Sequence, residues 1–153
     1  MKDQVDGLRV DGVAASYLNS TLLPHERDEV LASVRDGRCR LLYVSPERIV
    51  GEGSQALRRM LQQARLRFIA IDEAHCISQW GHDFRPEYRQ LGRLREEFPS
   101  VSLHAFTATA TERVRRDIVG ELRLRDPLVL VGSFDRPNLT YRVLRREIGR
   151  AHV

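Results

Sequence analysis

The sequence is poor in cysteine and in long apolar runs, and each shortage excludes a class of protein. Cys39 and Cys76 are the only cysteines. They are too few and too ill-spaced for a disulfide framework or a cysteine-based zinc site, so we expect reduced thiols. No apolar run approaches the roughly 20 residues that span a bilayer, and the first residues lack the apolar core of a signal peptide. The sequence therefore predicts a cytoplasmic protein.

A glycine-rich phosphate loop of the form G-x-x-x-x-G-K-[ST] is also missing. Such a loop cradles nucleotide phosphates with its backbone N–H groups, and its lysine reaches the terminal phosphates. The local glycine pair in GEGSQ (51–55) is not followed by a lysine, and no glycine loop precedes Lys2. We therefore expect that the chain by itself does not hydrolyse a nucleoside triphosphate.

What is present is a globular composition with a basic surplus. The 153 residues are 42% hydrophobic and 30% charged, with a net charge of +4, which is enough apolar material for one packed core. Lys2 is the single lysine among the 25 basic residues, and the arginines suit bidentate phosphate contacts. The surplus favours a polyanionic partner, but a codon-usage bias toward arginine explains the composition equally well.

Short apolar segments alternate with helical patterns along the chain, which is typical of an α/β fold with a mostly parallel sheet. Strands are predicted at 13–18, 40–45, 66–72, 101–107 and 128–132. All but 101–107 are nearly continuous in apolar residues, as in strands buried on both faces. Apolar residues at three-to-four spacing predict helices at 25–36, 54–64, 87–97 and 110–123.

Two of the chain's turns carry signals for the start of a helix. Ser45 precedes Pro46, which suits an N-cap followed by the first helical residue. In TATE (109–112), Thr109 is predicted to cap the helix and Glu112 to reach back to it, as in a capping box.

Two adjacent carboxylates follow the third apolar segment. RFIAI (67–71) is predicted to be a central strand, and Asp72 and Glu73 come directly after it. Ligands of open parallel sheets bind beyond the carboxyl ends of the strands, and two carboxylates there need a positive partner. Asp72 is therefore predicted to hold a hydrated Mg²⁺ that carries nucleotide phosphates, and Glu73 to orient and deprotonate the attacking water.

Two other interpretations of this segment stay open. A solvated helix start, favoured by the helix dipole, would also place two carboxylates together, with the nearby histidine purely structural. Alternatively, the segment supplies the ligand types of a metal-dependent hydrolase, although the spacing of known zinc motifs is absent. The ligands of that site would be Asp72, His75, Cys76, His82 and Asp83.

An aromatic-rich stretch, ISQWGHDFRPEY (77–88), follows at once. Trp80, Phe84 and Tyr88 are interspersed with polar residues and lie beside Arg85, which makes a poor core segment. Aromatic faces stack on bases of any sequence, and a neighbouring arginine adds phosphate or cation–π contacts. The stretch predicts a surface for single-stranded nucleic acid, with ordinary core aromatics as the alternative.

Extended to 72–88, the segment DEAHCISQWGHDFRPEY resembles the box-II motif and aromatic-rich loop of the RecQ family of ATP-dependent DNA helicases. Other segments resemble further motifs of that family in the same order: MKDQVDGL (1–8) motif Ia, LNSTL (18–22) the segment after it, LLYVSPERI (41–49) motif Ib, FTATAT (106–111) motif III, and SFDRPNLTYRV (133–143) the passage into the second motor domain. The resemblance implies a RecA-like α/β fold, with helices on both faces of a mostly parallel sheet that is truncated at its N-terminus.

The resemblance also implies roles for the matched residues. Asp72 and Glu73 would serve ATP hydrolysis with Mg²⁺, and His75 would link the nucleotide site to DNA. Single-stranded or partly duplex DNA would contact Lys2, Ser45, Pro46, Glu47, Trp80, His82, Phe84 and Arg85. Coupling of the two sites would involve Gln79, Thr107 and Thr109.

The same resemblance implies a domain plan. Residues 1–132 would be a partial first motor domain without its phosphate loop, and 133–153 would begin the linker into a second motor domain. The parent protein would be a 3′-to-5′ DNA helicase of repair and recombination in the bacterial cytoplasm, associated with the nucleoid when on DNA. The chain alone is expected to be inactive and marginally stable. The alternative is a stand-alone nucleic-acid-binding or regulatory module that has lost its motor.

Overall fold

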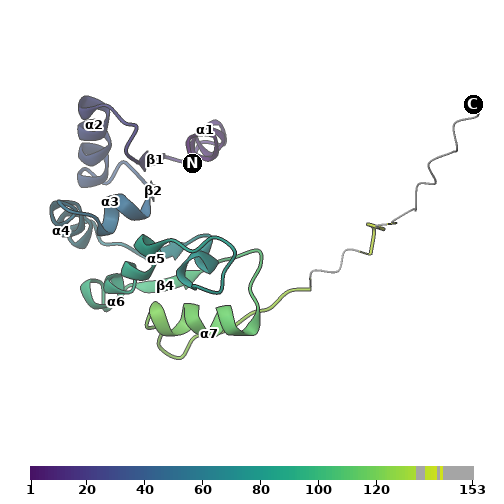
Figure 1. Ribbon diagram of the computed structural model, residues 1–153. Helices are drawn as coiled ribbons and strands as arrows, with labels where there is room; N and C mark the ends of the chain where they lie inside the picture. Colours follow the sequence, from purple (N-terminus) through teal and green to yellow (C-terminus); the bar gives the residue numbers. More distant parts are fainter. Residues whose placement is uncertain (134–136, 141, 143–153) are drawn as a thin grey trace, which may run out of the picture.

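The computed structural model describes residues 1–133, 137–140 and 142. In this part of the chain, short strands alternate with helices (Figure 1). The strands are β1 (Ala15–Leu18), β2 (Leu41–Val44), β3 (Phe68–Ile71) and β4 (Ser102–Ala105). The helices are α1 (Lys2–Val10), α2 (Pro24–Arg35), α3 (Pro46–Val50), α4 (Gln55–Gln63), α5 (Pro86–Gln90), α6 (Arg93–Glu97) and α7 (Glu112–Glu121), with a 3₁₀ helix, η1 (Ala74–Ile77), after β3. The predicted α/β class with parallel strands is confirmed.

The strands form two parallel pairs instead of one sheet. β1 pairs with β2, and β3 pairs with β4; no ladder joins the two pairs within the described residues. The prediction that 67–71 is a central strand buried on both faces is wrong. Phe68 is 53% exposed whereas Ile71 is 5% exposed, because β3 has a single partner strand and the core covers only one face of the pair.

The predicted strand at 128–132 is wrong as well. Leu128 and Leu130 are 84% and 82% exposed, and the segment runs away from the body of the molecule after α7 (Figure 1). Apolar, β-prone residues form a strand only when a neighbouring strand pairs with their backbone N–H and C=O groups. The predicted linker at 133–153 lies mostly outside the described residues.

The predicted helix at 87–97 is interrupted between α5 and α6. A Cβ atom at Gly92 would lie 2.2 Å from the carbonyl oxygen of Glu121 at the end of α7, so the turn passes closer to α7 than any residue with a side chain allows. The other three predicted helices are found within two residues of their expected ends. Helix α1 was not predicted, because Val5 is its only buried residue and its apolar periodicity is weak.

Of the two predicted helix starts, the one at Ser45 and Pro46 is confirmed and the one in 109–112 is wrong. Ser45 and Pro46 occupy the N-cap and first helical positions of α3, although the Ser45 side chain makes no capping hydrogen bond. Thr109 does not cap α7. Thr111 does so instead, since its Oγ1 accepts the N–H of Val114 at 3.4 Å.

One hydrophobic core joins most of these elements, while the buried Val5 of α1 and Ala15 and Leu18 of β1 lie outside it. Its buried members come from α2, α3, α4, β3, η1, α6 and α7, and include Val34, Ile49, Leu61, Leu94 and Ile118. The core includes Ile71 of β3, Ala74 and Ile77 of η1 and three residues in and after α7, so the chain is anchored where it leaves β3 and enters the loop before α5. None of the helices in the described ranges is long and apolar enough to cross a bilayer.

Candidate functional site

The two carboxylates lie in a sharp bend at the carboxyl end of β3. The N–H of Phe106 donates to the oxygen of Ile71 at 2.8 Å, and the N–H of Ala74 donates to the oxygen of Phe106 at 2.9 Å; these bonds hold the end of β4 against the bend. Glu73 has a φ of +50°, which is rare for a residue with a side chain, and its N–H donates to Oδ1 of Asp72 at 2.9 Å. Glu73 is the N-cap residue of η1 and makes no side-chain capping bond, so the pair does lie at the start of a helical turn and the helix-start interpretation stays open.

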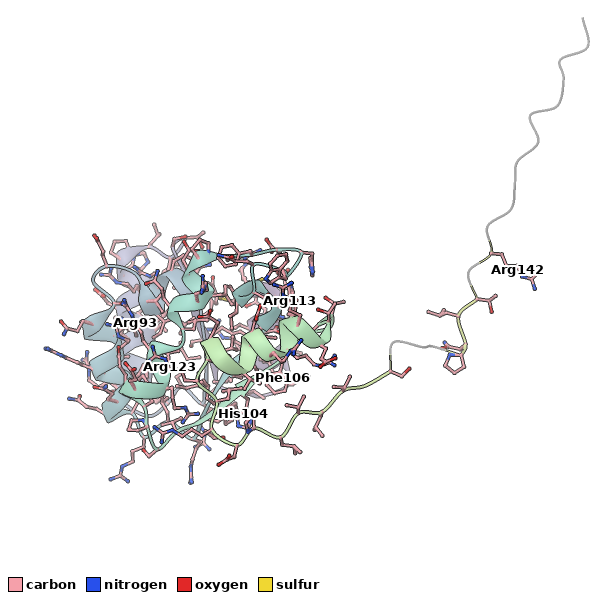
Figure 2. The ribbon with its side chains drawn as sticks, turned by 60° about the horizontal axis from the view of Figure 1, so that its bottom comes forward. Arg93, His104, Phe106, Arg113, Arg123 and Arg142 are labelled. Atoms are coloured by element: carbon pink, nitrogen blue, oxygen red, sulfur yellow. The ribbon has the colours of Figure 1, made fainter. Side chains whose placement is uncertain are left out.

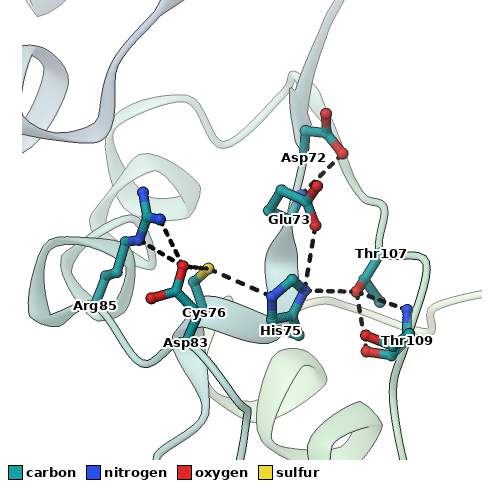
Figure 3. A network of polar contacts seen from close by, with 8 residues as sticks. All are labelled: Asp72, Glu73, His75, Cys76, Asp83, Arg85, Thr107 and Thr109. Atoms are coloured by element: carbon teal, nitrogen blue, oxygen red, sulfur yellow. Dashed lines mark hydrogen bonds and ion pairs between the residues drawn. The ribbon is translucent and has the colours of Figure 1, made fainter.

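His75 is the centre of a polar network that joins the bend to the end of β4 (Figure 3). Its ring is buried, with Nδ1 2.9 Å from Oγ1 of Thr107 and 3.3 Å from Oε2 of Glu73. The Thr107 hydroxyl also lies 3.1 Å from the carbonyl oxygen of Thr109; when it donates there, it accepts a hydrogen bond from Nδ1–H of His75. Residues predicted from two separate motifs thus meet in one network.

A second polar group lies on the other side of His75. The His82 ring stacks on the His75 ring with centroids 4.2 Å apart. The hydrogen bond from Arg85, 3.1 Å long at Nε, lowers the pKa of Asp83. Burial, followed by the nearby Asp83 charge, raises the pKa of Cys76. Near neutral pH, Asp83 is therefore a carboxylate and Cys76 is a protonated thiol.

The two polar groups line one surface pocket. Its walls are Glu73, His75, Cys76, His82, Asp83, Arg85 and Tyr88. The metal-hydrolase interpretation has no support here, because no three His, Cys, Asp or Glu side chains of the described residues form a metal-ligand group. The His75 and His82 rings stack instead of turning their nitrogens toward a common point.

The aromatic loop runs from η1 to α5 and projects one large ring into solvent. Trp80 is 62% exposed, so the interpretation of this residue as an ordinary core aromatic is wrong. Phe84 and Tyr88 are half-buried, while Gln79 and Arg85 are exposed. The loop therefore offers an open indole face with a basic side chain nearby.

Gly81 lets the loop backbone pass against η1. A Cβ atom there would lie 2.4 Å from the carbonyl oxygen of His75 and 3.2 Å from that of Ser78. We expect Gly81→Ala to lower the free energy of unfolding by about 1–3 kcal/mol, because the backbone must shift to relieve the overlap. Urea denaturation followed by circular dichroism measures the change. Gly120→Ala on α7 is the control, since its Cβ would meet nothing within 4 Å; equal effects of the two substitutions would contradict the prediction.

The residues predicted from motifs Ia and Ib lie apart from this pocket. Lys2 is exposed on α1 and forms an ion pair with Asp6 at 3.9 Å. The segment 45–47 opens α3, which packs against α5, and α5 begins directly after the aromatic loop. The structure thus brings together the box-II, motif III and loop residues. Helix α3 packs against α5, which follows the loop, and Lys2 lines no part of the pocket.

Sequence reasoning missed the support that α7 gives the loop. The Ser78 hydroxyl donates to Oδ2 of Asp117 at 2.5 Å, and its Oγ accepts the N–H of Trp80 at 3.1 Å. The guanidinium carbon of Arg113 lies 3.6 Å from the centroid of the Trp80 ring. Because these partners are distant in the sequence, no local pattern predicts the contacts. The sequence indicates only that Arg113 and Asp117 share one face of a helix.

Known proteins resemble this chain over most of its length. Residues 4–118 match the DEAD/DEAH box helicase family. The chain is 47% identical over 146 residues to the ATP-dependent DNA helicase RecQ of Pasteurella multocida and 44% identical over 148 residues to that of Bacillus subtilis, matches that cover 95% and 96% of the chain. It spans only 23% and 24% of the length of those relatives. With a family match over most of its residues, the chain belongs to the DEAD/DEAH box helicases, and within them it is similar to the RecQ proteins.

Proposed function

We propose that the chain is part of the first motor domain of a RecQ-type DNA helicase, in which ATP hydrolysis is coupled to single-stranded DNA. The observation that carries the proposal is the buried His75, which contacts Glu73 and Thr107 at Nδ1 and stacks on His82 of the aromatic loop. Residues 1–132 belong to that domain and 133–153 lead out of it. The parent protein unwinds DNA with 3′-to-5′ polarity in repair and recombination.

The carboxylates after β3 fit a hydrated magnesium ion with ATP. Both side chains are exposed oxygen donors, and Mg²⁺ takes one or two carboxylates while it keeps several waters. Asp72 uses one oxygen for the N–H of Glu73, which leaves its second oxygen for the ion or for a water bound to it. When bound, Mg²⁺–ATP supplies the phosphoryl group and the positive charge that offsets the developing negative charge.

Glu73 holds and deprotonates the attacking water in this proposal. Its Oε2 lies 3.3 Å from Nδ1 of His75, so the imidazole orients the carboxylate. Thr107 fixes the ring through its hydrogen bond with Nδ1, and it is itself hydrogen-bonded to Thr109. A movement of the 107–109 segment would therefore shift the Glu73 carboxylate, which is a physical route for coupling the two sites. Gln79, exposed in the aromatic loop, takes part in this coupling on the side that faces DNA.

The DNA-binding surface is the exposed side of the aromatic loop. Trp80 supplies a stacking face, while His82 and Arg85 lie on the side of the loop that lines the pocket. Phe84, half-buried in the same loop, contributes a second ring to this surface. The DNA backbone continues past the start of α3, at 45–47, and past Lys2 on α1.

A chimera tests the proposal. The segment of the Pasteurella multocida RecQ helicase that matches this chain is replaced by the chain, which restores a complete helicase around it. Single-stranded DNA is expected to stimulate ATP hydrolysis by the chimera, whereas the chain alone hydrolyses no ATP because it carries no phosphate loop. A folded chimera that binds DNA without any stimulation of ATP hydrolysis would favour the second candidate, a nucleic-acid-binding module without a motor, which the missing phosphate loop also permits.

A further inference from the structure

Helix α7 contacts the aromatic loop through two side chains that lie one helical turn apart. Arg113 rises from α7 toward the body of the molecule (Figure 2), and its guanidinium carbon lies 3.6 Å from the centroid of the Trp80 ring. Asp117 accepts the hydroxyl of Ser78, which is 1% exposed and in turn accepts the N–H of Trp80. The ring and the backbone of Trp80 are therefore both tied to the same helix.

The position of Arg113 divides the indole into a covered face and an open face. A planar guanidinium stacks on an aromatic ring and is attracted by it. Trp80 nevertheless remains 62% exposed, so the other face is open to a planar ligand. A base stacked there would have the arginine on the opposite side of the ring, with its positive charge close to the nucleic-acid backbone.

We propose that Arg113 is a positioning residue that presents one face of Trp80 to a nucleobase, and that Asp117, acting through Ser78, fixes the backbone beneath the ring. The inference rests on the proposed binding of single-stranded DNA by the aromatic loop. Because α7 begins directly after Thr111, the same helix connects the 107–109 segment to the loop by a route that does not pass through His75. Motif III and the DNA-binding loop are then joined twice.

Trp80 is the single tryptophan of the chain, so its fluorescence measures the position of the ring without any ligand. We expect Arg113→Gln to raise the acrylamide quenching constant, because the covered face becomes accessible. Arg113→Lys should raise it as well, since an ammonium group cannot cover the ring as a plane. Arg116→Gln is the control: it removes the same charge from an exposed site on α7 that has no ion pair or ring contact among the described residues. Equal quenching in all four proteins, each checked for helical content by circular dichroism, overturns the proposal.

Binding of fluorescein-labelled oligothymidine, followed by anisotropy, tests the consequence for nucleic acid. Arg113→Gln is expected to weaken binding by about two- to fivefold more than Arg116→Gln, which corresponds to the loss of an exposed cation–π contact beyond the loss of one charge. Equal weakening by the two substitutions overturns the proposal, even when Trp80→Ala abolishes binding and so supports the loop assignment. If the unaltered chain does not bind oligothymidine, the proposed function fails, and the quenching constants alone decide whether Arg113 positions the ring.

Discussion

Glu73→Gln is expected to lower DNA-stimulated ATP hydrolysis by the chimera at least about 100-fold, because an amide cannot accept the proton of the attacking water. The amide is nearly the same size as the carboxylate, and its oxygen can keep the 3.3 Å contact that Oε2 of Glu73 makes with Nδ1 of His75. The bend after β3 and the binding of ATP should therefore be unchanged. Steady-state hydrolysis with saturating single-stranded DNA gives kcat, and equilibrium binding of a fluorescent ATP analogue shows whether nucleotide affinity is retained.

The matched control for this experiment is Glu52→Gln. Glu52 is an exposed glutamate in the turn between α3 and α4 and has no part in the pocket, so its substitution should leave kcat unchanged. A Glu73→Gln chimera that keeps its hydrolysis rate within a few-fold of the unaltered chimera would remove Glu73 from the role of base. In that case the carboxylate network around His75 would be structural, and the nucleotide would be hydrolysed by another group.

Trp80→Ala is expected to weaken the binding of oligothymidine to the chain by roughly tenfold or more, because stacking on an aromatic ring contributes about 1–3 kcal/mol per base. The slope of affinity against salt concentration should stay the same, since no charge is removed. Fluorescence anisotropy of a labelled oligonucleotide across a salt series measures both quantities.

Phe68→Ala provides the aromatic control for this substitution. Phe68 is also a large exposed ring, at 53%, but it lies on β3 and makes an edge contact with His104, 5.8 Å between centroids. Its loss should leave the affinity for oligothymidine unchanged. If Trp80→Ala binds as tightly as the unaltered chain, base stacking does not hold DNA at the aromatic loop, and the basic side chains alone account for binding.

The part of the site that lies at the carboxyl ends of the strands could be predicted from the sequence. Glu73 follows one predicted strand and Thr107 ends another, and the carboxyl ends of two parallel strands meet at one edge, so the strand pattern is compatible with their proximity. The family resemblance implied only that His75 links the nucleotide site to DNA, and its contacts with Glu73 and Thr107 came from the structure. The contacts of Arg113 and Asp117 with the loop could not be predicted, because they depend on how α7 packs against η1, and no local pattern encodes that packing.

The same distinction explains which elements of the fold were predicted. Segments such as β1 and β2 have both the apolar residues and a partner strand, and they were found where expected. The segment 128–132 is apolar too, but it has no partner strand in the described part of the chain. The apolar pattern alone therefore predicted a strand that does not form. The break at Gly92 likewise has a tertiary cause, the close approach of Glu121, which cannot be read from helical periodicity.

The burial of Cys76 has a consequence for how the pocket withstands oxidative damage. Peroxides and alkylating reagents attack thiolates, so a thiol whose pKa is raised by burial reacts slowly even when water reaches its neighbours. Cys39 is partly exposed and would react with such reagents first, and it lies more than 30 positions before the carboxylates in the sequence. A sulfur atom 3.7 Å from the ring of His75 can therefore remain beside the hydrolytic network without making it sensitive to oxidants.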